Sequence, residues 1–276
     1  MATVETQLQS NLSVKLAFRN LGKTFFVQGE PKLALLNISA EIKTGEFVSI
    51  VGASGCGKST LIRIAAGLEQ ASEGGVYVEN NLVTSPGRDR GMVFQQFSLF
   101  PWLTVKENVM FGLQDQYPDK VRREEKALVW VERVGLVEFV DYYPNQLSGG
   151  MQQRVAIARA LAPGPKVLLM DEPFAALDAQ TRSRMQRHLL EIWRELNITV
   201  VFITHDLEEA IFLGDKVHIV TTRPCQLKKT VEVKIPRPRS YETQSSEKFR
   251  KLLEEVNDAV HEEAVKAFKA GEREMA

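Results

Sequence analysis

The sequence contains little cysteine and no long apolar run. Its 276 residues include only two cysteines, Cys56 and Cys225, too few for the disulfide framework of a small secreted protein. No segment reaches the 18 or so consecutive apolar residues of a transmembrane helix, the longest runs being those at 47–51 and 167–170. We therefore expect a protein of a reducing compartment, in which any membrane role depends on partners.

Neither sign of charge is in excess, since 35 basic residues are matched by 35 acidic ones. The sequence lacks the positive footprint that nonspecific binding to nucleic acid or anionic lipid requires, so we expect no nucleic-acid partner. Residues 1–12 are polar, include Glu5 and lack an apolar core segment. This pattern predicts an N-terminal tail rather than a secretory signal.

Apolar periodicity predicts one α/β core with appendages. Strands are expected at 14–18, 47–51, 166–170, 199–203, 217–220 and 229–235, with a turn at Gly74-Gly75 before another strand at 76–78. Helical spacing covers 104–140, with one face at Val105, Val109 and Leu113 and another at Ala127, Val131 and Val134. A further helix at 181–196 has a stripe at Met185, Leu189, Ile192 and Leu196.

Two prolines, Pro236 and Pro238, end the last predicted strand, because proline has no amide donor for a sheet. Beyond them the sequence predicts an amphipathic helix with polar residues on its other faces. Its apolar stripe is Phe249, Leu252, Leu253, Val256, Val260, Ala264 and Phe268. Two interpretations stay open for this helix: packing on its own or on a sister subunit, or binding of a regulator or another subunit.

A glycine-rich segment follows the apolar run 47–51 and precedes a helical pattern, which is the context of a P-loop. It reads Gly52-Ala53-Ser54-Gly55-Cys56-Gly57-Lys58-Ser59-Thr60. Glycines let consecutive N–H groups turn toward phosphate oxygens at a helix N-terminus. We expect Lys58 to reach the β- and γ-phosphates of ATP and the Ser59 hydroxyl to bind Mg²⁺, a cation that prefers oxygen ligands.

Two carboxylates, Asp171 and Glu172, end the apolar run 167–170. The carboxyl ends of strands are where α/β sheets display catalytic groups. We expect Asp171 to hold Mg²⁺ or its water, and Glu172 to orient the water that attacks the γ-phosphate. An acidic pair after a strand can instead cap a helix, and this alternative stays open.

A second glycine pair, in Leu147-Ser148-Gly149-Gly150-Met151-Gln152-Gln153-Arg154, opens a predicted helix and offers another anion site. With this motif the sequence resembles the ATP-binding cassette (ABC) family over residues 14 to 235. The resemblance implies that two cassettes sandwich ATP, and that Ser148, Gly149, Gly150 and Met151 face the nucleotide of the other subunit. Met151 departs from the family, which most often has Gln there.

Other positions match the family in order. The resemblance implies that Gln95 is the Q-loop glutamine near Mg²⁺, that Asp178 belongs to the D-loop across the dimer, and that His205 is the switch histidine on the γ-phosphate. Phe25 aligns with the aromatic residue that stacks on adenine, although a core-filling role is the alternative. The implied fold is a P-loop α/β domain at 13–235, with an antiparallel β subdomain and a helical subdomain at about 97–160. Residues 236–276 form a linker and the C-terminal helix.

The resemblance is strongest to importer subunits of the nitrate/sulfonate/taurine branch, to which bicarbonate carriers also belong. It rests on the runs 91–102, 171–178 and 235–239. The implied function is ATP hydrolysis at the cytoplasmic face of the plasma membrane, coupled to import. The implied partners are a second cassette, the same or paralogous, permease subunits and, indirectly, a substrate-binding protein. The alternative is a nontransport ABC-type ATPase or a regulatory ATP-binding module.

One cluster bears on the permease. The aromatic and apolar side chains after Gln95 suit a groove that receives a short permease helix, or they form the core of the helical insert. They are Phe97, Leu99, Phe100, Pro101 and Trp102.

Overall fold

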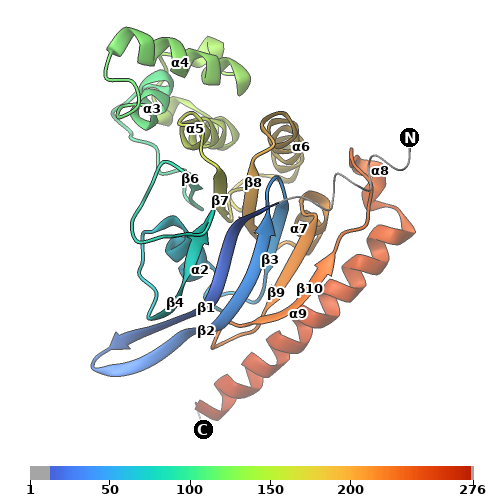
Figure 1. Ribbon diagram of the computed structural model, residues 1–276. Coiled ribbons are helices and arrows are strands. Elements are labelled where there is room, and N and C mark those ends of the chain that lie inside the picture. The colour runs from blue at the N-terminus through green and yellow to red at the C-terminus, as the bar shows by residue number, and fades with distance from the viewer. Residues whose placement is uncertain (1–12, 275–276) are drawn as a thin grey trace. The chain divides into compact units, whose positions relative to one another are not determined.

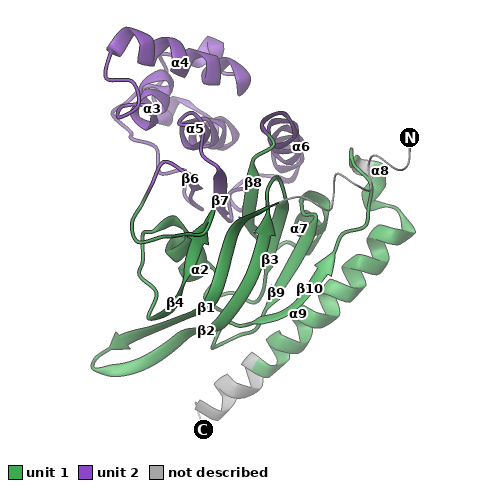
Figure 2. Ribbon diagram, in the orientation of Figure 1, with its two compact units in different colours: residues 1–86, 197–276 green, residues 87–196 purple. Residues whose placement is uncertain are grey.

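The computed structural model describes residues 13–274, apart from the side chains of Tyr241 and of 267–274 (Figure 1). The predicted N-terminal tail, 1–12, lies outside the described residues. The chain divides into two compact units, the first made of 1–86 and 197–276 and the second of 87–196 (Figure 2). The second unit is therefore one continuous insertion between two halves of the first.

Unit 1 contains an antiparallel sheet. Its strand order is β2-β1-β4-β5, formed by β1 (Val14–Val27), β2 (Glu30–Lys43), β4 (Glu73–Val78) and β5 (Asn81–Leu82). A two-residue loop, Gln28-Gly29, joins the first two strands, and both residues have positive φ, 54° and 88°. Such a loop matches the twist of a hairpin. The predicted antiparallel β subdomain is present, and β1 runs nine residues beyond the strand predicted at 14–18.

Unit 1 also contains parallel strands that are buried on both faces. Strand β3 (Phe47–Val51) pairs in parallel with β8 (Thr199–Ile203) and with β9 (Lys216–Val220), and β10 (Leu227–Glu232) pairs antiparallel with β9. Every residue of β3 and β8 is buried, as expected for uniformly apolar runs. The last strand ends at Glu232 and not at Ile235 as predicted, although the amide of Val233 still donates to the carbonyl oxygen of Asp215 at 2.9 Å.

The helices in the described part of unit 1 are α2 (Lys58–Ala66), α7 (Leu207–Leu213), α8 (Tyr241–Gln244) and α9 (Glu247–Glu274). The long helix α9 is the predicted amphipathic helix, and it contacts α7 and β9 of its own unit. Phe249 and Val256 of the predicted stripe are buried. The prediction that Ala264 belongs to the buried stripe was wrong, because Ala264 is exposed. Its neighbour Glu263 is buried instead and forms an ion pair with Lys228. The side chain of Phe268 lies outside the described part.

Unit 2 contains two parallel strands, β6 (Arg90–Val93) and β7 (Val167–Asp171). Its helices are α3 (Val105–Gly112), α4 (Lys120–Arg133), α5 (Gly149–Leu161) and α6 (Ala179–Leu196), with single 3-10 turns at Val137–Phe139 and Pro144–Gln146. A capping box between Thr104 and Glu107 starts α3.

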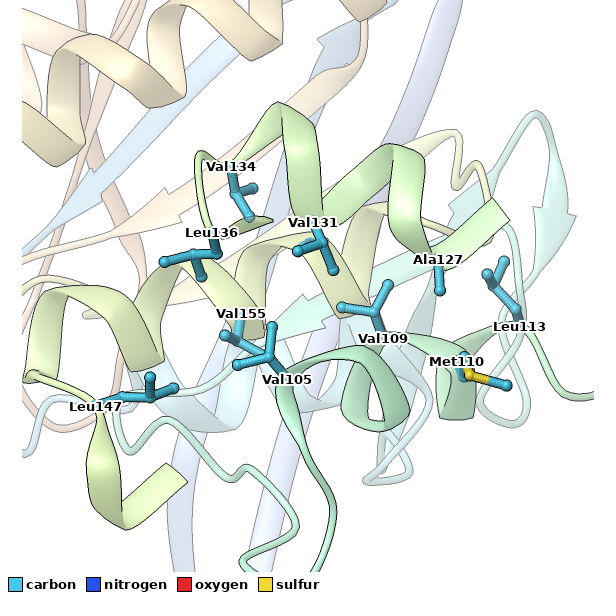
Figure 3. Close-up of a cluster of buried hydrophobic side chains, with 11 residues drawn as sticks. Val105, Val109, Met110, Leu113, Ala127, Val131, Val134, Leu136, Leu147 and Val155 are labelled. Atoms are coloured by element: carbon cyan, nitrogen blue, oxygen red, sulfur yellow. The ribbon is translucent and has the colours of Figure 1, made fainter. Parts of the chain in front are cut away.

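The helices α3, α4 and α5 enclose one hydrophobic cluster, drawn in Figure 3. The two faces predicted from sequence meet in it: Val105, Val109 and Leu113 from one, and Ala127, Val131 and Val134 from the other. Each of these six residues is at most 1% exposed. The predicted helical insert is therefore confirmed as a packed core.

The prediction of a turn at Gly74-Gly75 was wrong, because both glycines lie inside β4. A Cβ at Gly74 would stand 2.2 Å from the carbonyl oxygen of Arg19 in the neighbouring strand. These glycines permit close strand approach and a positive φ of 60° at Gly74, which is why they resemble a turn in the sequence. Among the described residues, none of the helices combines the length and apolarity needed to span a bilayer.

Candidate functional site: a phosphate-binding loop and two strand ends

The glycine-rich loop 52–57 connects β3 directly to α2. Gly55 and Gly57 have φ of 71° and 114°, conformations that residues with a side chain rarely adopt. A Cβ at Gly57 would lie 3.1 Å from Cβ of Cys225, whereas at Gly55 no heavy atom would lie within 4 Å. One side of the loop is thus packed and the other is open. An open backbone curve at a helix N-terminus fits the phosphates of ATP.

Lys58 places its charge at the start of the loop. Its Nζ donates to the carbonyl oxygens of Gly52 at 2.8 Å and Ala53 at 2.9 Å, and the residue is 5% exposed. The adjacent Ser59 is exposed, and its hydroxyl oxygen is the kind of ligand that Mg²⁺ prefers. Ser54 is also exposed and Thr60 is half-buried.

The thiols of Cys56 and Cys225 are hydrogen-bonded to each other beside this loop. The sequence analysis did not predict this contact. The hydrogen bond from the Cys225 thiol and the nearby Lys58 ammonium, 3.8 Å from Cys56 Sγ, lower the pKa of Cys56 to about 6 against the opposing effect of burial. The same hydrogen bond and burial raise the pKa of Cys225. No sequence signal links residues so far apart in the chain.

His205 follows β8 at the edge where the P-loop follows β3. Ile50 of β3 is paired with Ile203 of β8. Gly52 follows Ile50 by two residues and His205 follows Ile203 by two residues, so both come at the same level just after their strands. The imidazole is exposed, which argues against a core histidine. Parallel strands end at one edge of a sheet, and this edge carries both the loop and the histidine.

The backbone on both sides of His205 is fixed by short polar contacts. Thr204 Oγ1 accepts the amide hydrogen of Asp206 at 3.0 Å and donates to Glu209 at 2.5 Å. The Asp206 carboxylate caps α7 by accepting from the amide of Glu209 at 3.1 Å. The histidine is therefore held at its main chain, with its ring exposed.

Phe25 lies in β1 of the same unit. Its ring is partly exposed, with Lys23 Nζ 4.7 Å above the ring centroid, so it does not fill a core. The partly exposed face leaves the ring available for stacking.

In unit 2, Asp171 is the last residue of β7 and is 7% exposed. Glu172 follows with φ of 45°, a left-handed conformation that is costly for a residue with a side chain and that concentrates at functional sites. The alternative that this pair caps a helix is wrong, because α6 begins at Ala179. Asp178 has that role: its carboxylate accepts from the amides of Gln180 at 3.1 Å and Thr181 at 3.0 Å.

The hydrogen bonds from the Thr181 hydroxyl and amide also lower the pKa of Asp178. The predicted D-loop aspartate thus has a local structural role at the start of α6.

The serine-glycine-glycine motif forms the start of α5. Ser148 Oγ caps the helix by accepting from the amide of Met151 at 3.3 Å. Gly150 is packed closely, since a Cβ there would meet Thr181 Cγ2 at 2.5 Å, while one at Gly149 would have only ordinary contacts at 3.5 Å. Met151 packs on the hydrophobic cluster of Figure 3, so an apolar side chain suits this position.

Gln95 lies between β6 and α3 and is exposed, as is its neighbour Gln96. Unit 1 thus brings together the P-loop and His205, and unit 2 carries the carboxylates, the glycine motif, Asp178 and Gln95.

Comparison with known proteins identifies the family. The sequence profile of the ABC transporter family matches residues 35–175. The chain belongs to the ABC transporter family. It has the ABC ATPase fold, a mixed α/β arrangement with an antiparallel sheet and helical parts, as expected from the sequence.

Two relatives and one solved structure illustrate the match. The nitrate import ATP-binding protein NrtD of Synechocystis is 46% identical over 248 residues, covering 88% of this chain and 93% of that protein. The aliphatic sulfonates import ATP-binding protein SsuB of Bacillus cereus is 44% identical over 241 residues, covering 86% and 94%. The dimeric post-hydrolysis structure of the ATP-binding cassette MJ0796 bound to ADP and phosphate is 37% identical, with a TM-score of 0.71, covering 80% of this chain and 100% of that one.

Proposed function

We propose that this chain is the ATP-hydrolysing subunit of an ABC importer that takes up a small oxyanion through separate permease subunits. The P-loop geometry, with an open side at Gly55 and the Lys58 ammonium at its start, supports ATP binding. The similarity to nitrate and sulfonate import proteins over most of the chain supports import. Nitrate, sulfonates such as taurine, and bicarbonate form the substrate class.

The catalytic roles follow the chemistry of the side chains. Lys58 binds the terminal phosphates, and Glu172 orients and polarises the attacking water, with His205 on the γ-phosphate. The products are ADP and phosphate. Ser59, Gln95 and Asp171 supply oxygen atoms that would hold Mg²⁺, which neutralises phosphate charge when bound. Phe25 stacks on adenine.

The active form contains two cassettes. Ser148, Gly149, Gly150 and Met151 of one face the nucleotide held by the P-loop of the other, and Asp178 lies near the same interface. The dimeric state of the MJ0796 cassette supports this arrangement. A lone subunit then hydrolyses ATP slowly, because it lacks the second half of each site.

The surface after Gln95 is the proposed contact with the permease. Leu99 packs on the helical cluster, so the core interpretation holds for that residue. Trp102 and Phe111 are 69% and 50% exposed, and both rings lie against Phe100 at 5.6 and 4.4 Å between centroids.

Beside them a groove of about 260 Å³ contains charged and apolar side chains, among them Lys106, Met110, Phe111 and Glu124. An aromatic rim with a groove suits a short helix of a permease, which supports a position of this chain at the cytoplasmic face of the plasma membrane.

Transport by the complete assembly tests the proposal. The chain, its permease and its binding protein are reconstituted in vesicles, and ATP-dependent uptake of radiolabelled nitrate, taurine and bicarbonate is measured. We expect uptake of one anion, lost in a Lys58→Ala variant. ATP hydrolysis without uptake of any of them, and without membrane subunits in the purified complex, would instead support a nontransport ATPase.

A further inference from the structure

The segment 235–239, Ile-Pro-Arg-Pro-Arg, contacts the end of α7 through its two arginines, and we name it the arginine strap. Its residue Arg239 is 6% exposed. One nitrogen of its guanidinium donates to three carbonyl oxygens where α7 ends. They belong to Ile211, Phe212 and Gly214, at 2.9, 3.0 and 2.7 Å. These are carbonyls that a helix leaves without an internal partner at its C-terminus.

The other nitrogens of Arg239 bind carbonyl oxygens at the start of the strap and just before it. Nε and Nη2 donate to the carbonyl oxygen of Ile235, at 3.3 and 3.2 Å, and Nη2 also donates to that of Val233 at 3.4 Å. Burial and the neighbouring Arg237 lower the pKa of Arg239 to about 10, so the guanidinium remains charged at neutral pH. A positive charge at a helix C-terminus is favourable.

Arg237 also binds the C-terminal end of α7. Its guanidinium donates to the carbonyl oxygen of Leu213 at 2.6 Å and pairs with Asp215 at 2.7 Å. The second oxygen of Asp215 accepts from the amide of Phe47 at 2.9 Å. The strap is thus joined to β3, the strand that leads into the P-loop.

The opposite end of α7 begins two residues after His205. Because α7 has only seven residues, and five of them are buried, it has little freedom to bend between its ends. A shift of the helix at Leu213 is therefore transmitted to Asp206 and to the histidine main chain. Geometry errors of about 1 Å at a reacting group can cost about 100-fold in rate.

We propose that Arg239 and Arg237 are positioning residues for the switch histidine: by anchoring the end of α7 to β3 they set where His205 stands relative to the P-loop. The inference rests on the proposed role of His205 in hydrolysis. The contacts described for the two arginines are with main-chain carbonyls and with Asp215, and not with P-loop residues, so we expect an effect on turnover and not on ATP affinity.

The test uses the assembled transporter and compares Arg239→Lys and Arg237→Gln with Arg250→Lys, an exposed arginine of α9. Lysine keeps the charge of Arg239 but has no planar fork to reach several carbonyls. We expect about a 10-fold lower kcat for ATP in the Arg239 variant, a smaller loss in the Arg237 variant, and KM and ATP affinity within about 2-fold. Hydrogen exchange of the amides in α7 should accelerate. The Arg250 variant should match the parent.

A double-mutant cycle separates the strap from the proposed function. Residual turnover is measured by release of radiolabelled phosphate in His205→Ala, with and without Arg239→Lys. Loss of the Arg239 effect in the His205→Ala background supports the inference, while an equal loss in both backgrounds, or an unchanged kcat in the single variant, overturns it.

Full turnover in His205→Ala alone would instead refute the role of the histidine. Faster hydrogen exchange in α7 of the Arg239→Lys variant would in that case still show that the strap anchors the helix. If Arg239→Lys does not fold, Arg237→Gln, at a partly exposed site, replaces it in the same cycle.

Discussion

Lys228 of β10 forms a 2.9 Å ion pair with Glu263 of α9, although only 5% of the Glu263 side chain is exposed. The same ammonium donates to the carbonyl oxygen of Ala259 at 2.9 Å. The C-terminal helix is thus attached to its own unit by a buried polar contact as well as by Phe249 and Val256. This supports packing on the ATPase core as the role of α9.

Replacing this lysine should loosen the helix. In Lys228→Met the Glu263 carboxylate stays buried with the loss of one of its cationic partners, at a cost of about 2 kcal/mol. The matched control is Lys229→Met, whose ion pair with Glu255 is about half exposed on both sides and contributes well under about 1 kcal/mol. Urea unfolding of the two variants measures the difference. Equal stabilities would mean that the buried pair does not anchor α9.

The carboxylate Glu172 is the proposed base. Glu172→Gln keeps the shape of the side chain but cannot accept a proton, so we expect hydrolysis to fall by about 100-fold or more. ATP should stay bound and the cassette dimer should persist. Phosphate release and size-exclusion chromatography with ATP measure this, with Glu132→Gln, an exposed residue of α4, as control. Substantial remaining turnover would assign the base to another group.

The close contact between Gly150 and Thr181 predicts a rescue. In Gly150→Ala the new methyl group overlaps Thr181 Cγ2, which is held on a stiff β-branched side chain, so stability should fall by about 1–2 kcal/mol. Adding Thr181→Ser removes that methyl group and should restore most of the loss.

Gly149→Ala is the matched control for this contact. Its new methyl group would have contacts at 3.5 Å, which are ordinary, so thermal unfolding should show no loss. A similar loss in both alanine variants would assign the effect to helix geometry rather than to this contact.

His218 of β9 predicts loss of stability in acid. Burial, and then the charge of Lys216, lower its pKa to about 4, and its Nδ1 lies 2.9 Å from the Thr230 hydroxyl. The unfolded chain protonates this imidazole near pH 6.5 and the folded protein does not, so stability falls as the pH drops from about 6.5 to about 4. The contribution is about 3 kcal/mol.

The measurement is urea unfolding from pH 7 to pH 4. His218→Leu should flatten the pH dependence, whereas His261→Asn, at an exposed site of α9, should leave it unchanged. A His218→Leu variant with the parental slope would place the acid sensitivity in other groups.

Much of the fold was predictable because its signals are local. The P-loop needs glycines in a short segment, and the runs at 47–51 and 199–203 are apolar throughout, so their burial follows from composition. The helical cluster was predictable because one period of 3.6 residues marks Val105, Val109 and Leu113 together. The roles assigned to Glu172, His205 and Ser148 stay predictions.

What the sequence could not predict depends on residues far apart in the chain. Ala264 is apolar and Glu263 is charged, so side-chain polarity favoured Ala264 for the buried stripe, but Glu263 has an ionic partner in Lys228, a residue of another element. Gly74 resembles a turn residue, yet it is required by the approach of Arg19. The neighbour of Cys56 is Cys225, and only the folded chain brings them together.

The insertion of unit 2 into unit 1 has a consequence for synthesis. Strand β3 emerges from the ribosome early, but its parallel neighbours β8 and β9 are translated roughly 150 residues later, about 8–30 s at usual elongation rates. During that time the helices of unit 2 can form their cluster from contacts close in sequence. The apolar strand before the P-loop has no sheet to join. The nascent chain, rather than the finished protein, is therefore where chaperone protection of this sequence matters most.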